Sequence, residues 1–323
     1  MRSITLLVSA VLIATLTACG GVDPADEYRA AVPSRSQLSM DVPSSGGSQS
    51  QSLGQVGSLT QALLGQTAEL YALTYKVSHE VNGSIWVGLN IIESIVHTPP
   101  TSLVNNVAVW GPHTGALEPL TWKLTVAKTG PGRFSYVLSA RKKGDATGAF
   151  SPILAGTSQK GFSKYFTGFK GLYAVNADNL NALAPSLHPD TGKMVATYDT
   201  TGDKRSVQMA LENYSEAGAP PADALYSYLD RLDTSGEFRF VARTDMQKDG
   251  SAEEILAVTS AWDKTGAGRG DAAVTGGDMS SGLVVKLTEC WDDGFGRTFY
   301  EDSHSINPAE GSAASCVFAQ PLN

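Results

Sequence analysis

The chain has 323 residues, a formal net charge of −8, and 42% of its residues are hydrophobic. Its length allows a substantial core in one large domain or two small ones, and its composition is that of a soluble globular protein. The acidic balance argues against nucleic acid or an anionic lipid surface as a partner.

The first 19 residues carry an export pattern. Arg2 precedes an apolar run over residues 4–18, and this run of about 15 residues is shorter than the roughly 20 that a membrane-spanning helix needs. It ends in Leu16-Thr17-Ala18-Cys19, which is typical of a bacterial lipoprotein signal. We therefore predict that residues 1–18 are a signal peptide and that Cys19 is lipidated. The alternative is an ordinary secretory signal with an incidental cysteine.

Lipid attached to Cys19 predicts an exported protein that stays on a membrane, because two or more acyl chains anchor a protein stably. The next residue is Gly20 and not the Asp associated with inner-membrane retention in enteric bacteria. We therefore expect the outer membrane, on its periplasmic or surface face, in preference to the inner membrane.

Residues 19–57 are rich in Gly, Ser, Gln, Pro and Asp, and they lack apolar periodicity. The run from Ser44 to Gln51 contains only serine, glycine and glutamine. This composition predicts a disordered tether, which as a flexible coil would hold the folded part about 30 to 40 Å from the lipid surface.

Two cysteines remain once Cys19 is lipidated, namely Cys290 and Cys316. An even pair in an exported chain predicts a disulfide, which in the chain-entropy model stabilises the fold by roughly 3 to 4 kcal/mol. A metal site is the alternative, but His304 is the only histidine between the two cysteines and no Cys-x-x-Cys accompanies them.

Residues 58–97 are the helical part of the predicted fold. Apolar residues recur at spacings of seven or fourteen, and a second row runs beside the first, which indicates one apolar stripe along a helix. Asn82-Gly83 is turn-prone, so the pattern leaves open one long helix or two, and Pro99-Pro100 ends the region. Packing against the protein's own sheet is favoured over a coiled-coil dimer. The two rows are Leu63, Leu70, Val77, Ile91 and Thr67, Thr74, Val81, Gly88, Ile95.

Residues 105–320 change to a period of two, in which apolar and polar side chains alternate along short segments. Such strands belong to a sheet with one solvated face. Asp-Gly turns such as Asp190-Thr191-Gly192 and Asp249-Gly250 separate them, and residues 177–190 predict a short helix. The alternating apolar sets are Trp122, Leu124, Val126; Phe134, Tyr136, Leu138; Val207, Met209, Leu211; Phe238, Phe240, Ala242; and Leu283, Val285, Leu287.

These patterns together predict a single globular α+β domain over residues 58–323. A long N-terminal amphipathic helix would pack on a large, mostly antiparallel sheet of about ten or more strands. The sheet would curve around the helix as a half-barrel or close over it as a barrel.

Motifs for catalysis, cofactors and metals are incomplete in this sequence. The phosphate-loop-like run Gly156 to Gly161 is followed by Phe162, where Lys is required. No nucleophile elbow and no His-Glu-x-x-His occurs, and the five histidines are scattered. We therefore assign no catalytic residue, no cofactor and no metal ligand.

Two clusters near the C-terminus resemble functional sites. Ser303 and His304 follow Asp302, but on a strand they would point to opposite faces, so we expect no shared proton. Four carboxylates leave two interpretations open, a pair placed for acid-base or calcium chemistry and a solvated polar face, of which we favour the second. They are Asp292, Asp293, Glu301 and Asp302.

A set of C-terminal and central segments resembles uncharacterised predicted lipoproteins of myxobacteria across most of residues 60–320. This resemblance implies a lipidated, exported protein and supplies no catalytic residues. The segments are Val109-Trp110-Gly111-Pro112, Trp262, Gly266 to Asp271, Thr288-Glu289-Cys290-Trp291-Asp292, Tyr300, Asp302-Ser303 and Cys316.

Two functional hypotheses follow. The first is a non-enzymatic cell-envelope lipoprotein that acts as a scaffold or binding module, with the membrane, an apolar ligand or an envelope protein as partner. The second is a periplasmic carrier or chaperone of lipids or lipoproteins, for which the half-barrel would enclose a hydrophobic cavity lined by Leu, Val and Phe. An enzyme would instead require a cleft with clustered titratable groups.

Overall fold

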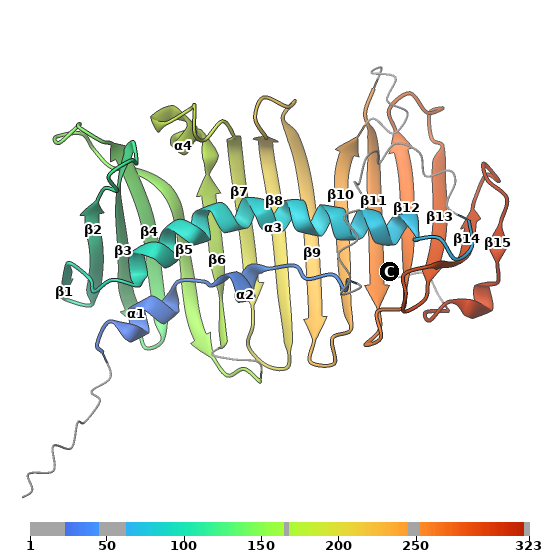
Figure 1. The fold of residues 1–323 in the computed structure, drawn as a ribbon, viewed down its shortest axis with the longest axis horizontal. Helices are drawn as coiled ribbons and strands as arrows, with labels where there is room; N and C mark the ends of the chain where they lie inside the picture. Colours follow the sequence, from blue (N-terminus) through green and yellow to red (C-terminus); the bar gives the residue numbers. More distant parts are fainter. Residues whose placement is uncertain (1–22, 45–62, 165–167, 245–251, 320–323) are drawn as a thin grey trace, which may run out of the picture.

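The computed structural model describes residues 23–44, 63–164, 168–244 and 252–319. In these residues fifteen strands form one antiparallel sheet, and each strand pairs with the next one along the chain (Figure 1). β1 and β15 are the two edges, so the sheet is open and the predicted closure into a barrel is not observed. The broad α+β class and the antiparallel sheet are confirmed.

The strands follow the chain from one edge of the sheet to the other. Their bounds are β1 (Ser102–Val104), β2 (Val107–His113), β3 (Leu120–Gly130), β4 (Arg133–Lys142), β5 (Ser151–Gly161), β6 (Gly168–Asn176), β7 (Thr191–Asp199), β8 (Lys204–Ser215), β9 (Ala222–Arg231), β10 (Gly236–Thr244), β11 (Glu254–Trp262), β12 (Gly268–Gly276), β13 (Val284–Trp291), β14 (Arg297–Asp302) and β15 (Glu310–Gly311).

The period-two pattern divides the sheet into two faces, which we call the helix face and the free face. On β3, Trp122, Leu124 and Val126 are buried, while Lys123 and Thr125 between them are only half-buried. β4 repeats the pattern, with Phe134, Tyr136 and Leu138 buried. Side chains of one parity therefore build the core, and those of the other parity line the free face.

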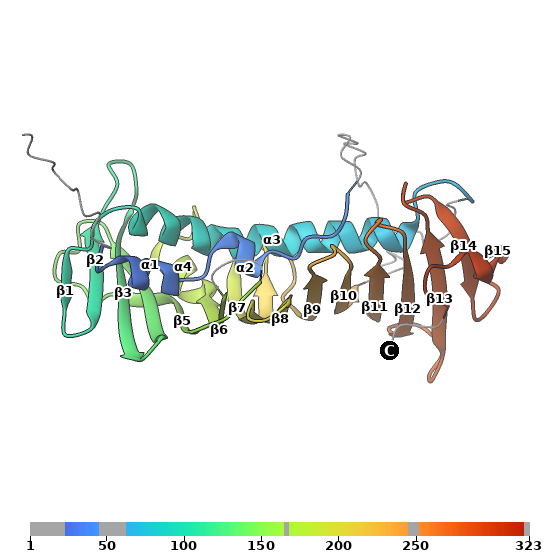
Figure 2. The same cartoon turned by 90° about the horizontal axis from the view of Figure 1, so that it is seen from below.

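The helix α3 (Glu69–Val96) runs across the strands on the helix face (Figures 1 and 2). Its core-facing residues are Leu70, Leu73, Val81, Ile85, Leu89 and Ile92, all buried. Leu63, which we placed on the apolar stripe, lies before the helix and is 59% exposed. The short helix α4 (Ala177–Leu183) lies within residues 177–190, where one was predicted.

α3 continues without a break through Asn82-Gly83, because Asn82 has a specific partner. Its side-chain oxygen accepts from the Met40 backbone N–H at 2.8 Å, and its amide donates to the Met40 carbonyl at 3.1 Å. Gly83, the next residue, is exposed. A helix-weakening residue is thus offset by two buried hydrogen bonds.

Charged side chains form hydrogen bonds with backbone groups at both ends of α3. At the N-terminus, the Glu289 carboxylate accepts from the Leu70 backbone N–H at 2.6 Å and from Arg297 Nε at 2.5 Å. At the C-terminus, Arg29 Nε donates to the Val96 carbonyl at 2.9 Å. The negative and positive groups match the helix dipole and satisfy backbone groups that the helix leaves free.

The tether prediction is wrong for residues 23–44, which pack along one side of α3 on the helix face (Figure 1). We call this segment the strap. It contains α1 (Asp26–Ala31) and α2 (Arg35–Leu38). Its main apolar residues are buried, namely Tyr28, Val32, Leu38, Met40 and Val42, and the last three alternate with Ser39 and Asp41 at a period of two. The remainder of the predicted tether and the signal peptide lie outside the described residues.

Candidate ligand-binding groove

The strap covers one side of α3, and a groove opens along the other side, where α4 and the ends of β8 to β11 lie (Figure 1). Its main part has a volume of about 250 Å³. The helix supplies one wall with Leu73, Val77 and Val81. The strands supply an apolar floor from their helix face, made of Met209, Leu211, Tyr226, Phe240 and Leu256.

A second hollow of about 60 Å³ continues the groove toward β4 and β5. Ser84 on α3 lines both hollows and stands between them. The second hollow is also mainly apolar, with Ile91, Leu138, Leu154, Val175 and Met194 among its lining residues. The two hollows thus lie one after the other along α3 and share Ser84.

Polar groups also line the second hollow, namely Asp190 and Tyr214. The Tyr214 hydroxyl donates to Asp190 Oδ2 at 3.2 Å, and the Ala217 backbone N–H donates to Asp190 Oδ1 at 3.1 Å. Burial, with the nearby Asp190 charge, raises the pKa of Tyr214 to about 12. Because Tyr214 gives its single hydroxyl proton to Asp190, its oxygen can only accept a hydrogen bond from the polar end of a ligand.

Charged side chains form the rim of the main hollow: Lys76 and Glu80 from α3, Glu216 after β8, and Arg243 from β10. Burial, together with the charges of Asp190 and Glu80, raises the pKa of Glu216. Burial also raises the pKa of Tyr226 on the floor to about 12. The site thus combines an apolar interior with a polar entrance, which is the arrangement of small-molecule binding sites.

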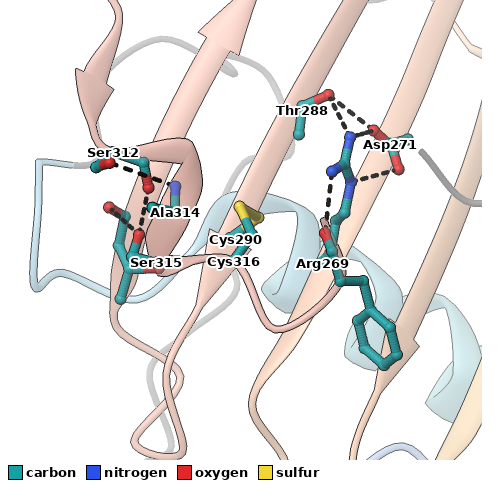
Figure 3. Close-up of a disulfide and its surroundings, with 10 residues drawn as sticks. Arg269, Asp271, Thr288, Cys290, Ser312, Ala314, Ser315 and Cys316 are labelled. Carbon is teal, nitrogen blue, oxygen red and sulfur yellow. Dashed lines mark hydrogen bonds and ion pairs between the residues drawn. A yellow bond between two sulfur atoms is a disulfide. The ribbon is translucent and has the colours of Figure 1, made fainter. Parts of the chain in front are cut away.

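The predicted disulfide is confirmed and lies away from the groove. Cys290 and Cys316 are bonded, with their Cα atoms 5.4 Å apart (Figure 3). Cys290 on β13 is fully buried, and beside it Arg269 pairs with Asp271 and donates to the Phe318 carbonyl at 3.1 Å. The bridge therefore fastens the C-terminal segment to the free face of β12 and β13.

The expectation for Ser303 and His304 is wrong, because both residues lie in the turn after β14 and not on a strand. Ser303 Oγ and His304 Nδ1 are 2.8 Å apart. The Asp302 carboxylate accepts from three backbone N–H groups of this turn, those of His304, Ile306 and Asn307. Asp302 is thus occupied as a turn cap, and the pair itself is exposed.

The four C-terminal carboxylates do not converge on one site. Asp292 accepts from the backbone N–H groups of Gly294 and Gly296 in the turn before β14, whereas Asp302 caps the turn after it. Within residues 23–44, 63–164, 168–244 and 252–319, no group of three His, Cys, Asp or Glu side chains lies close enough to bind a metal. Cys19 lies outside the described residues, and its lipidation stays a prediction.

Several groove residues were recognisable from sequence and others were not. Val77 lies on the predicted helix stripe, and Met209, Leu211 and Phe240 belong to predicted strands. The polar residues Tyr214 and Glu216 gave no sequence signal, because they come near Ser84 and Glu80 only when β8 folds beside α3.

None of the helices in the described residues is long and apolar enough to cross a membrane. Comparison with protein-family models, curated proteins and solved structures finds no match for this chain. The function is therefore inferred from the residues and geometry of the molecule itself.

Proposed function

We propose that this protein is a lipid-anchored, non-enzymatic binding module of the bacterial cell envelope, which holds an apolar ligand in the groove beside α3. The observation that carries the proposal is the groove itself, about 250 Å³ and lined by Leu, Val, Met and Phe. Transfer of apolar surface from water into such a site is favourable by roughly 25 cal/mol per Å².

The envelope location is supported by two features of the chain. The sequence Leu16-Thr17-Ala18-Cys19 matches a lipoprotein signal. The Cys290–Cys316 disulfide is typical of oxidising compartments outside the cytoplasm. We place the protein on the outer membrane, at its periplasmic or surface face.

A carrier of acyl chains or lipoproteins is the second candidate. In this proposal the sheet and the long amphipathic α3 form the body of a half-barrel, an architecture similar to that of periplasmic lipoprotein carriers. That similarity concerns the fold and does not by itself imply function. The observation that favours the carrier is the second, mainly apolar hollow farther along α3, which shares Ser84 with the groove.

A charge inside the groove tests the binding proposal. Val77→Glu places a carboxylate against the apolar floor, so it should weaken binding of a fluorescent fatty acid by at least about tenfold. The measurement is a fluorescence titration of the soluble form, residues 20–323, exported behind a cleavable signal peptide.

The matched control is His79→Glu, which adds the same charge to an exposed position two residues away on α3. Its affinity should stay within about twofold of the unmodified protein. Equal affinity of all three proteins, or no binding by any of them, would contradict a ligand site in this groove.

A further inference from the structure

The free face of the sheet carries a hollow of about 690 Å³ over β4 to β8. The helix, the strap and the groove all lie on the other face (Figure 2). The hollow is therefore a separate surface, and its side chains form lateral rows in which neighbours come from adjacent strands about 4.8 Å apart.

Strand pairing defines three parallel rows, each crossing the five strands in order. The first row is apolar, the second carries hydroxyl and amide groups, and the third carries charges. The rows are Val137, Ala155, Ala174, Val195, Ala210; then Ser135, Thr157, Leu172, Thr197, Gln208; and then Arg133, Gln159, Lys170, Asp199, Ser206. Apart from the apolar Leu172, the residues of the second and third rows line the hollow.

Cations dominate this end of the strands, in contrast to the overall net charge of −8. Arg133 and Lys170 in the third row are exposed and stand two strands apart. Exposed lysines continue the positive charge along the same strand ends: Lys160, Lys164 and Lys204.

The carboxylates at this end are fewer, and one is already engaged. Asp199 Oδ1 accepts from the Thr201 backbone N–H at 2.8 Å and from its hydroxyl at 2.6 Å. Asp203 lies in the turn that follows. The described part of this surface is therefore locally basic and favours an anionic ligand.

We propose that the free face of β4 to β8 binds an acidic polysaccharide, a sugar chain that carries carboxylate or phosphate groups, laid across the strands. Each chemical part of such a chain has a matching row. Arg133 and Lys170 pair with its anionic groups, and the hydroxyl and amide row exchanges hydrogen bonds with its sugar hydroxyls. The flat row of Val and Ala side chains contacts the C–H faces of the rings.

The same rows disfavour a nucleic acid, although it is also anionic. Proteins that hold single-stranded nucleic acid stack its bases on aromatic side chains, and none of the fifteen residues in the three rows is aromatic. Small side chains spaced across strands suit hydroxyl-rich rings better than stacked bases.

The experiment measures binding of three probes to the full-length protein, purified in detergent: polygalacturonate, the neutral glucan dextran, and a 20-nucleotide oligothymidine. Polygalacturonate should bind, and its affinity should fall as salt rises. Arg133→Gln with Lys170→Gln should weaken that binding by about tenfold, because two charge-assisted contacts are lost.

The control is Arg239→Gln with Lys286→Gln, which removes the same charge from the free face outside the hollow. It should change the affinity for polygalacturonate by less than about twofold. Absence of polygalacturonate binding, equal binding of dextran, tighter binding of oligothymidine, or equal losses in both double variants would each overturn the proposal.

Discussion

At the scale of single residues, the charges that matter most are buried and hold distant segments together. Glu289 is 1% exposed, yet it joins β13 to Arg297 on β14 and to the first turn of α3. A second network joins the strap to the sheet, where buried Arg205 pairs with Asp41 at 2.9 Å and with Asp230 at 3.2 Å. Removing one member of such a network takes the closest partner from a buried charge; Arg297, for example, would be left with longer contacts such as those to Glu69 at 3.7 Å and Glu310 at 3.6 Å.

Replacement of Glu289 by Ala should therefore destabilise the protein by about 3 to 5 kcal/mol, because Arg297 and the Leu70 N–H lose their shared acceptor. Denaturant unfolding of the purified protein measures the change. Glu301→Ala, at an exposed position on β14, is the control and should stay within about 0.5 kcal/mol of the parent.

The Glu289 carboxylate also predicts that the stability of the fold falls as pH rises. Burial raises the pKa of Glu289 despite the opposing Arg297 charge, so the folded state binds the proton more tightly than the unfolded chain does. The contribution of Glu289 to the free energy of unfolding is therefore fully present below the ordinary glutamate pKa, and it is lost as pH rises through the raised pKa. Glu289→Gln should therefore gain stability relative to the parent as pH increases, and an unchanged difference across that range would contradict this account.

At the scale of elements, the position of α3 is set by how closely its backbone approaches the sheet. A Cβ added to Gly88 would lie 2.4 Å from the Tyr173 hydroxyl oxygen and 3.0 Å from Leu154 Cδ1. Gly83, five residues earlier, has nothing within 4 Å of an added Cβ. The helix therefore has room for a side chain at Gly83 but none at Gly88.

Gly88→Ala should destabilise the protein by about 1 to 3 kcal/mol through overpacking, whereas Gly83→Ala should stabilise it by about 0.5 to 1 kcal/mol through helix propensity. Thermal and denaturant unfolding of both variants measure the difference. If both substitutions shifted stability in the same direction, the close packing of α3 on Tyr173 would not be supported.

The sequence predicted helices and strands well where only one face of the segment is buried, because the apolar residues then recur with the period of the element. Trp122, Leu124 and Val126 alternate because α3 covers only one side of β3, so burial and period coincide. Asn82 suggested a break because its partner, Met40, lies 42 residues away. The sequence does not reveal the turn at Ser303-His304, because the Asp302 carboxylate caps it through backbone N–H groups, which side-chain patterns do not show.

At the scale of the whole molecule, a wide open sheet avoids self-association through its edges by making them short. β1 has three residues and β15 has two, so neither edge offers a long row of free backbone groups to another chain. The helix face is filled by α3 and the strap, while the groove beside α3 and the free face remain accessible. The molecule thus presents two chemically different surfaces, one apolar and one polar and basic.

The candidate groove could be predicted from the sequence only in part, because periodicity indicates burial but not the space left between elements. Its apolar members Val77, Met209 and Phe240 belong to periodic segments and were expected in the core. Whether they would leave a groove depended on which side of α3 the strap covers. The strap residues Leu38, Met40 and Val42 alternate with polar residues, but this run is short, lies in a Ser-rich, Pro-containing stretch and does not indicate which side of α3 it covers.

Native mass spectrometry of the protein extracted from membranes tests the central claim most directly. We expect a chain that begins at Cys19 and retains acyl groups under denaturing conditions, together with a lipid-sized ligand that is released on denaturation. Val77→Glu should lose the released ligand and keep the covalent acyl groups, and His79→Glu should keep both. A bare protein mass, or a ligand retained by Val77→Glu, would contradict an apolar binding module anchored by lipid.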